Sequence, residues 1–155
     1  MTLAERLQAD MTAAMREHDE VRRDALRMAV AALQRAEKDA RHPLSSDEEI
    51  GVLTREVRTR RESVDAFAHG GRPDLAAGEQ AKLDALNPYM PAQLGDDEID
   101  ALIGAAIDET GAVEPRDLGR VMKVLAPRVR GRADGRQIHS LVTRELARRI
   151  SAARR

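Results

Sequence analysis

Cysteine is absent from the 155 residues, so this chain forms no disulfide and has no thiolate to act as nucleophile or metal ligand. Aromatic residues are almost absent, since Phe67 and Tyr89 are the only two. This scarcity argues against a protein that binds single-stranded nucleic acid by stacking bases on aromatic rings. No apolar run approaches the ~18 residues of a membrane span. The first residues, MTLAERLQADM, carry charges where a signal peptide is apolar. We therefore expect a cytoplasmic protein without membrane contact.

Patterns typical of catalytic and metal sites are also missing. The four histidines, His18, His42, His69 and His139, are scattered, and no two of them are three or four residues apart on a helix. No serine has the surroundings of a nucleophile elbow. The many carboxylates follow polar helix faces, and no pair can be distinguished as acid and base. The sequence therefore predicts no catalytic residue, no metal and no cofactor, and it disfavours an enzyme acting alone.

Helical periodicity, by contrast, runs through the first ninety residues. Thr2 and Glu5 form a capping-box pattern before an apolar set at helical spacing. Asp19 can cap a second helix, which Pro43 interrupts because a proline disfavours helix at the residue before it. The apolar sets of these two helices are Leu3, Leu7, Met11 and Met15, then Leu26, Val30 and Leu33.

A third helix is predicted to begin with a capping box of Ser46 and Glu49 and to end at the glycines of HGGR, residues 69–72. Its apolar positions are Ile50, Leu53, Val57, Val64 and Phe67. A fourth helix follows over residues 74–86 with Leu75, Leu83 and Leu86. The stretch NPYMPAQLG, residues 87–95, contains two prolines and a final glycine. It is the best domain boundary in the chain.

Beyond this boundary the apolar periodicity is cleaner, and three more helices are expected. Their apolar sets are Ile99, Leu102, Ile103 and Ile107, then Leu118, Val121, Met122 and Leu125, then Ile138, Leu141, Val142, Leu146 and Ile150. No strand-like alternation competes with them. The sequence predicts an all-α fold with a four-helix N-terminal subdomain, residues 1–90, and a three-helix C-terminal subdomain with a basic surface, residues 91–155.

The net charge of −1 hides a sharp division along the chain. Residues 91–115 contain seven acidic groups and no basic one, whereas residues 116–155 contain twelve basic groups and three acidic ones. Part of this has a structural explanation, because Asp96, Asp97 and Glu98 fall in the first turn of a helix, where carboxylates are favoured. Two subdomain surfaces that compensate each other would give the same division. A surface for an anionic partner is the alternative.

The positive charges of the last forty residues form a stripe and a loop. Arg116, Arg120 and Lys123 are spaced so that they lie opposite the apolar positions of the sixth helix and face solvent. The loop that follows, APRVRGRADGRQIH at residues 126–139, adds four arginines. We call the following set the basic surface: Arg116, Arg120, Lys123, Arg128, Arg130, Arg132 and Arg136.

Several residues of this loop have local structural explanations. Pro127 stops or kinks the sixth helix, Gly131 permits a backbone conformation closed to other residues, and Asp134, followed by Gly135, can cap the seventh helix. These explanations leave the four arginines unaccounted for. No GKS or GKT follows, so the loop is not a P-loop. Because Asp134 already occupies the first helical turn, contact with a nucleic-acid backbone fits better than an enclosed phosphate.

Two stretches resemble a known family. GRPDLAAGEQAKLDALNPYMPAQL, residues 71–94, and DLGRVMKVLAPRVRGRADGRQIHSLV, residues 117–142, are similar to the GatB/YqeY family. That family includes stand-alone bacterial proteins and the C-terminal tail of the GatB subunit of tRNA-dependent amidotransferases. The resemblance implies a two-subdomain helical fold. It also implies tRNA contact by the tail-like part, with the amidation chemistry, a carbon–nitrogen ligase activity using glutamine, located elsewhere.

These observations lead to a functional hypothesis and a rival. The hypothesis is a helical module that binds tRNA or another structured RNA and is accessory to tRNA-dependent amidation. An aminoacyl-tRNA synthetase or an amidotransferase subunit would then be its protein partner. Any RNA would be recognised by shape and backbone rather than by base stacking. The rival is a protein-interaction module without RNA binding, whose basic surface meets an acidic partner.

Overall fold

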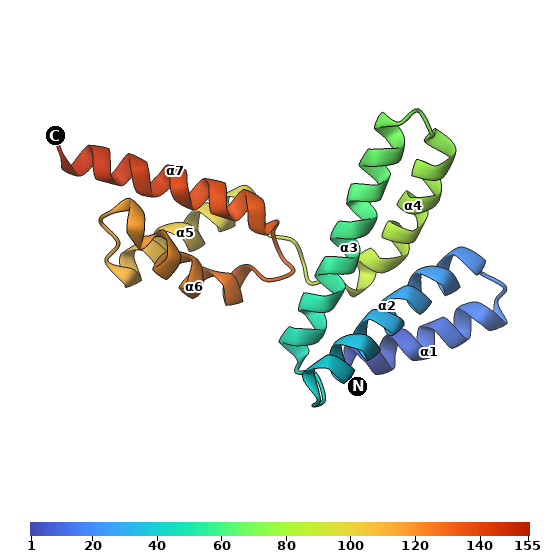
Figure 1. The fold of residues 1–155 in the computed structure, drawn as a ribbon. Coiled ribbons are helices and arrows are strands. Elements are labelled where there is room, and N and C mark those ends of the chain that lie inside the picture. Colours follow the sequence, from blue (N-terminus) through green and yellow to red (C-terminus); the bar gives the residue numbers. More distant parts are fainter. The chain divides into compact units, whose positions relative to one another are not determined.

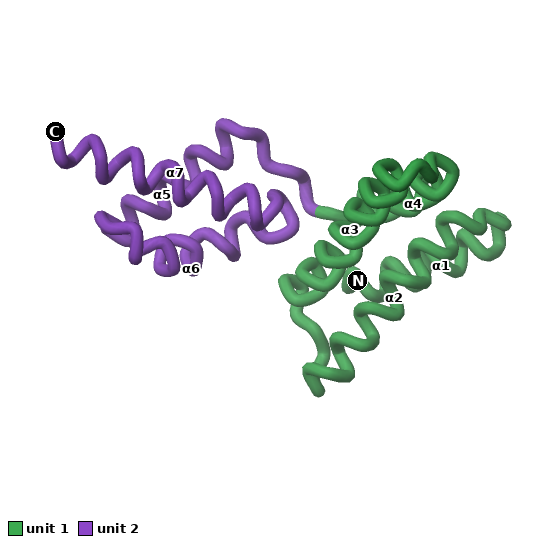
Figure 2. Tube along the Cα trace, turned by 45° about the horizontal axis from the view of Figure 1, so that its top comes forward, with its two compact units in different colours: residues 1–90 green, residues 91–155 purple.

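The computed structural model describes all 155 residues and consists of helices and their connections. Seven α-helices and two short 3-10 helices follow one another, and no strand is present, so the predicted all-α fold is confirmed. The contacts divide the chain into two compact units, Met1–Met90 (unit 1) and Pro91–Arg155 (unit 2) (Figure 2). Each unit has its own apolar core.

Unit 1 contains two helical hairpins. The first pairs α1 (Leu3–Arg16) with α2 (Glu20–Ala40), and the second pairs α3 (Ser46–His69) with α4 (Pro73–Leu86) (Figure 1). A 3-10 helix, η1 (Asn87–Tyr89), follows α4. The core gathers one face of each helix, and its most deeply buried large side chains are Leu7, Leu26, Leu53 and Leu86. Each such leucine contributes about 1.5–3 kcal/mol through burial.

The helix starts of unit 1 agree with the sequence at two places and differ at a third. Thr2 and Glu5 form the predicted capping box, and the carboxylate of Asp19 accepts the backbone N–H of Arg22 at 3.0 Å. The capping box of α3, however, is formed by Ser45 and Glu48, one residue before the predicted pair. The prediction was wrong because SSDEE offers two overlapping capping-box patterns.

Glu49, the residue predicted to complete that box, has a different role. Its side chain is buried, and its carboxylate oxygens accept the backbone N–H groups of Leu3 at 3.1 Å and Ala4 at 3.2 Å. Free N–H groups at a helix start need such acceptors, and a carboxylate there is also favoured by the helix dipole. Glu49 therefore caps α1 from the first turn of α3 and joins the two hairpins.

Unit 2 is a three-helix bundle of α5 (Asp96–Thr110), α6 (Leu118–Val129) and α7 (Gly135–Ala153), with the 3-10 helix η2 (Pro115–Asp117) before α6. The predicted apolar stripes form its core: Ile99, Ile103, Ile107, Val121, Leu125, Ile138, Val142 and Leu146 are all buried. Pro127 does not stop α6, which runs on to Val129. The carbonyl deprived of its N–H partner is that of Lys123, on the exposed face, where water can replace the lost bond.

Candidate nucleic-acid interface

All seven residues of the basic surface belong to unit 2. Arg116 lies in η2, three of the residues lie in α6, Arg130 and Arg132 lie in the connection to α7, and Arg136 lies in the first turn of α7. Six of the seven side chains are exposed, and Arg132 is half-buried. Val121 and Leu125, the apolar positions of α6, are completely buried, so Lys123 and the arginines of this helix are on its solvent side.

Three arginines of the basic surface are paired with carboxylates of the same unit. Arg128 donates through Nη2 to both oxygens of Glu109, at 2.8 and 3.0 Å. Arg116 pairs with Glu114. Acidic residues that precede η2 therefore neutralise basic residues of η2 and α6 within unit 2. The sequence analysis left open that two subdomain surfaces compensate each other's charge, but it did not identify these partners.

Arg120 is the most firmly held of the three. Its guanidinium lies 3.0 Å from Asp117 and also donates to the carbonyl of Thr110 at 2.8 Å. Asp117 accepts the backbone N–H groups of Val113 and Glu114, at 2.9 and 3.0 Å. The hydrogen bond from Val113, followed by that from Arg120, lowers the pKa of Asp117 to about 2. The carboxylate of Asp117 is therefore charged, and it holds the loop before α6 by accepting these two backbone N–H groups.

The connection between α6 and α7 is itself an ordered turn that holds the start of unit 2. Gly131 has a φ of +72°, as its predicted conformational role requires. The N–H of Leu94 donates to the carbonyl of Arg132 at 2.8 Å, and the side chain of Gln93 donates to the carbonyl of Gly131, also at 2.8 Å. Arg132 returns a bond from Nε to the carbonyl of Ala92 at 3.1 Å. Arg132 thus has a structural role that the sequence interpretation missed.

The start of α7 is built as predicted. The helix begins at Gly135, and the side chain of Asp134 accepts the backbone N–H of Arg136 at 2.9 Å. A capping carboxylate therefore occupies the position that an enclosed phosphate would need.

Positive groups without a carboxylate partner remain on this unit. Lys123 and Arg130 are exposed and take part in no ion pair or side-chain hydrogen bond. Arg144 in α7 is a third such group, and sequence reasoning overlooked it. Its signal was present, because Arg136, Ser140, Arg144 and Arg148 recur every four residues on the side of α7 opposite the buried stripe.

The outward face of α7 differs from that of α5. Along α7 the only acid is Glu145, at the flank of this face, where Arg148 and Arg149 both contact it. The hydrogen bond from Arg148 lowers the pKa of Glu145 most strongly. Burial opposes this effect, the hydrogen bond from Arg149 adds to it, and the resulting pKa is about 2. On α5 the charged residues are all acidic. Unit 2 therefore presents an acidic helix and two basic ones.

No arrangement in the chain suggests a metal ion or a membrane span. No group of three or more histidine, aspartate or glutamate side chains is placed to hold a metal. None of the helices combines the length and the apolar character that crossing a bilayer requires.

Comparison with known proteins identifies the family. A model of the Yqey-like protein family matches residues 4–146. The chain belongs to this family. The match extends through both units, so the resemblance seen in the sequence motifs is confirmed over almost the whole chain.

Two curated relatives carry the same printed name, "Altered inheritance of mitochondria protein 41, mitochondrial". The protein from Pyrenophora tritici-repentis is 32% identical over 134 residues, which cover 83% of this chain and 71% of that protein. The protein from Eremothecium gossypii is 32% identical over 87 residues, which cover 56% of this chain and 48% of that protein.

Proposed function

We propose that unit 2 binds structured RNA, tRNA included, through the phosphate backbone. The observation that carries this proposal is a set of exposed cationic groups without a carboxylate partner, Lys123, Arg130 and Arg144. They lie on α6, on α7 and on the turn between them, which also carry all of the basic surface except Arg116. Phosphate neutralisation by lysine and arginine supplies most of the sequence-independent affinity of proteins for nucleic acid.

The paired arginines add to this surface rather than cancelling it. Exposed ion pairs contribute only about 0–1 kcal/mol each, because solvent and salt screen them. A phosphate can therefore take over the guanidinium of Arg128 or Arg116 from its carboxylate at small cost. Arginine is suited to this exchange because its planar fork fits phosphate and carboxylate alike.

The kind of RNA follows from what unit 2 does not contain. Phe67 and Tyr89 both belong to unit 1, so unit 2 has no phenylalanine, tyrosine or tryptophan ring on which an unpaired base could stack. Double-helical RNA is bound chiefly through its shape, its phosphates and its 2′-hydroxyls. Folded RNA with helical stems, such as tRNA, is therefore the partner that this surface fits.

An accessory role in tRNA-dependent amidation is the biological setting that we propose, with an aminoacyl-tRNA synthetase or amidotransferase subunit as protein partner. The motifs shared with the GatB/YqeY family support it. The chain alone should not catalyse amidation, because we find no nucleophile and base arranged for the reaction. The cytoplasmic location predicted from the sequence stays a prediction, whereas the curated relatives carry mitochondrial names.

The test is the binding of total tRNA by the full-length protein at ~150 mM salt, measured by fluorescence anisotropy. The proposal expects saturable binding that weakens steeply as salt rises. Poly-glutamate at matched charge serves as the competitor that distinguishes an RNA from an acidic protein. If the protein binds poly-glutamate as tightly as tRNA, the RNA proposal is wrong and a protein-interaction role takes its place. If the protein binds neither polymer, the RNA proposal is also wrong.

A further inference from the structure

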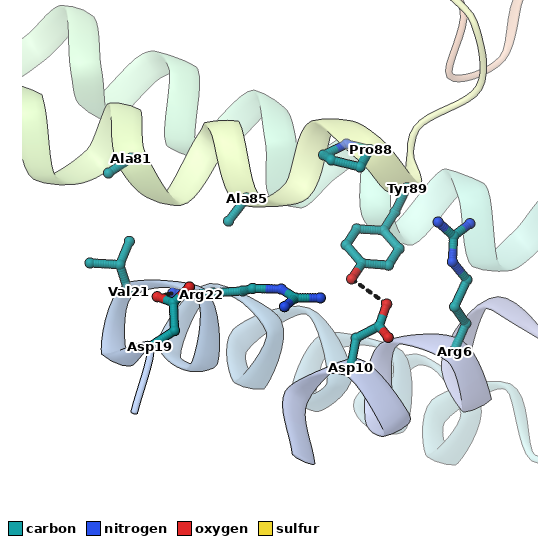
Figure 3. A pocket seen from close by; sticks show the side chains of 9 residues that line it. All are labelled: Arg6, Asp10, Asp19, Val21, Arg22, Ala81, Ala85, Pro88 and Tyr89. Carbon is teal, nitrogen blue, oxygen red and sulfur yellow. Dashed lines mark hydrogen bonds between the residues drawn. The ribbon is translucent and has the colours of Figure 1, made fainter. Parts of the chain in front are cut away.

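Unit 1 contains a pocket that the proposed function does not use. It lies between the α1–α2 hairpin and the end of α4, and its volume is about 490 Å³. Sites for small organic ligands are typically about 300–1,000 Å³. Figure 3 shows the side chain of Arg22 extending along the pocket toward Tyr89, with Ala81 and Ala85 of α4 on the opposite wall.

One wall of this pocket is apolar. Ala81 and Ala85 are small, and these two positions on one side of α4 leave space that larger side chains would fill. Val21 faces them from the first turn of α2 and is 46% exposed, which is high for a large apolar residue. Pro88 of η1 completes this wall. The free energy gained by covering these groups favours a ligand with an apolar body.

One end of the pocket is polar and centred on Tyr89. The Tyr89 hydroxyl donates to a carboxylate oxygen of Asp10 at 2.6 Å (Figure 3). The guanidinium carbon of Arg6 lies 4.7 Å from the centre of the Tyr89 ring, within the range of a cation–π contact. Burial, followed by the bond to Asp10, raises the pKa of Tyr89, and a hydrogen bond with Tyr89 raises the pKa of Arg22.

The two arginines at this end lie on either side of the hydrogen bond between Tyr89 and Asp10 (Figure 3). Arg6 takes part in no ion pair, and the carboxylate contact of Arg22 is with Glu17 at 3.5 Å. Arg23, the neighbour of Arg22, contacts Asp24 at 2.8 Å. Arg22, which lies on the same side as Val21, Ala81 and Ala85, therefore retains donors that a ligand can use.

We propose that this pocket binds a small organic acid with one carboxylate, which contacts Arg22 while an apolar body rests on Val21, Ala81 and Ala85. The proposal is independent of RNA binding, because all its residues lie in unit 1.

The choice of a single negative charge follows from the acids that line the same pocket. Asp10 accepts from Tyr89, and Asp19 accepts from the backbone N–H of Arg22, so both are held in place. A phosphate dianion would be repelled twice as strongly by both carboxylates, and it would lose more hydration free energy on entering the pocket than a monoanion does. A carboxylate carries one charge, and its two oxygens match the guanidinium fork.

The experiment is a titration of the full-length, isotope-labelled protein with octanoate, followed by the NMR signals of the methyl groups that line the pocket. We expect saturable shifts at Val21, Ala81 and Ala85, with a Kd on the order of 1–10 mM, as the usual efficiency of such ligands predicts. Octanamide, a neutral molecule of the same shape, should bind at least five-fold more weakly. Equal binding of the two, or no saturation at these methyl groups, would overturn the proposal.

Two variants test the polar end and the apolar wall separately. Arg22→Gln should weaken octanoate binding about five-fold or more and leave octanamide unchanged. Arg35→Gln is the matched control, because Arg35 is exposed on the same helix and does not line the pocket. Ala81→Leu should fill the pocket and abolish binding while Arg22 remains. Octanoate affinity that survives Ala81→Leu in the folded protein contradicts the assignment of the site.

Discussion

Glu109 near the end of α5 holds Arg128 near the end of α6, with one guanidinium nitrogen donating to both carboxylate oxygens at 2.8 and 3.0 Å. Both side chains are partly open to solvent. An RNA phosphate and the Glu109 carboxylate would therefore compete for the same donors. If the basic surface binds RNA as proposed, the acidic run of α5 would limit its affinity for RNA rather than merely balance its charge.

The first prediction follows from this competition. Glu109→Gln removes the competing charge and frees Arg128, so tRNA affinity should rise about two- to five-fold, as the small free energy of an exposed pair allows. Anisotropy titrations at ~150 mM salt measure it. Asp100→Asn is the control, because it removes one charge from the same helix at a carboxylate without an ion-pair partner. An equal rise in both variants would show that only the net charge matters.

The cap of α7 should affect stability and affinity in opposite directions. Asp134→Ala removes the acceptor for the N–H of Arg136, at a cost of about 1 kcal/mol in the free energy of unfolding of unit 2. It also removes a negative charge from the turn, so tRNA affinity should stay the same or increase. Urea unfolding followed by circular dichroism, together with anisotropy, checks both. Weaker binding by the folded variant would contradict this prediction.

The contact between Glu49 and the start of α1 should stabilise unit 1. Glu49→Gln replaces an ionised acceptor that serves two N–H groups, so the free energy of unfolding should fall by about 1–3 kcal/mol. Hydrogen exchange of the first turns of α1 should accelerate locally. Asp39→Asn, at an exposed carboxylate of α2 without a partner, should change stability by less than about 0.5 kcal/mol. Unchanged exchange in α1 would mean that Glu49 does not cap it.

Acid should destabilise unit 2 in a defined pH range. The folded-state pKa values of Asp117 and Glu145 are both about 2, below the ordinary values of these groups. Their contribution is therefore complete above the unfolded-state pKa, near pH 4, and is lost as the pH falls from about 4 to 2. The thermal midpoint of unit 2 should fall across this range, and less steeply in Asp117→Asn. An identical pH dependence in the two proteins would exclude Asp117 as a cause.

The sequence predicted the elements of this fold well and their long-range partners poorly. Periodicity located the buried faces of α5, α6 and α7 because a helix repeats its contacts every three to four residues. Capping residues act locally too, and Thr2, Asp19 and Asp134 cap as predicted. Glu49 shows the limit, since its partners lie more than forty residues earlier in the chain.

The candidate site shows the same division. The solvent-facing position of Lys123 follows from the helical pattern, whereas the partners of two arginines could not be inferred. Arg128 reaches across to Glu109, and Arg132 reaches back to the carbonyl of Ala92. Such contacts depend on how helices are placed in the bundle, and spacing along the chain does not encode this. Arg144 was not predicted although its helical spacing is visible in the sequence, because it lies in α7, away from the arginine-rich turn.

The central claim is that unit 2 binds RNA through the phosphate backbone. It is tested most directly by the salt dependence of tRNA binding in a double variant that leaves every ion pair intact. Lys123→Gln with Arg130→Gln removes the two basic-surface groups that have no partner, so the fold should be unchanged. If about four groups contact phosphates, the logarithm of the association constant should fall with the logarithm of salt at a slope of roughly −3 to −4.

The double variant should flatten this slope by about one to two. The control, Arg55→Gln with Arg58→Gln, removes two exposed and unpaired arginines from unit 1 and should leave the slope as it is. A slope and affinity that do not change in the Lys123 and Arg130 variant would contradict the account.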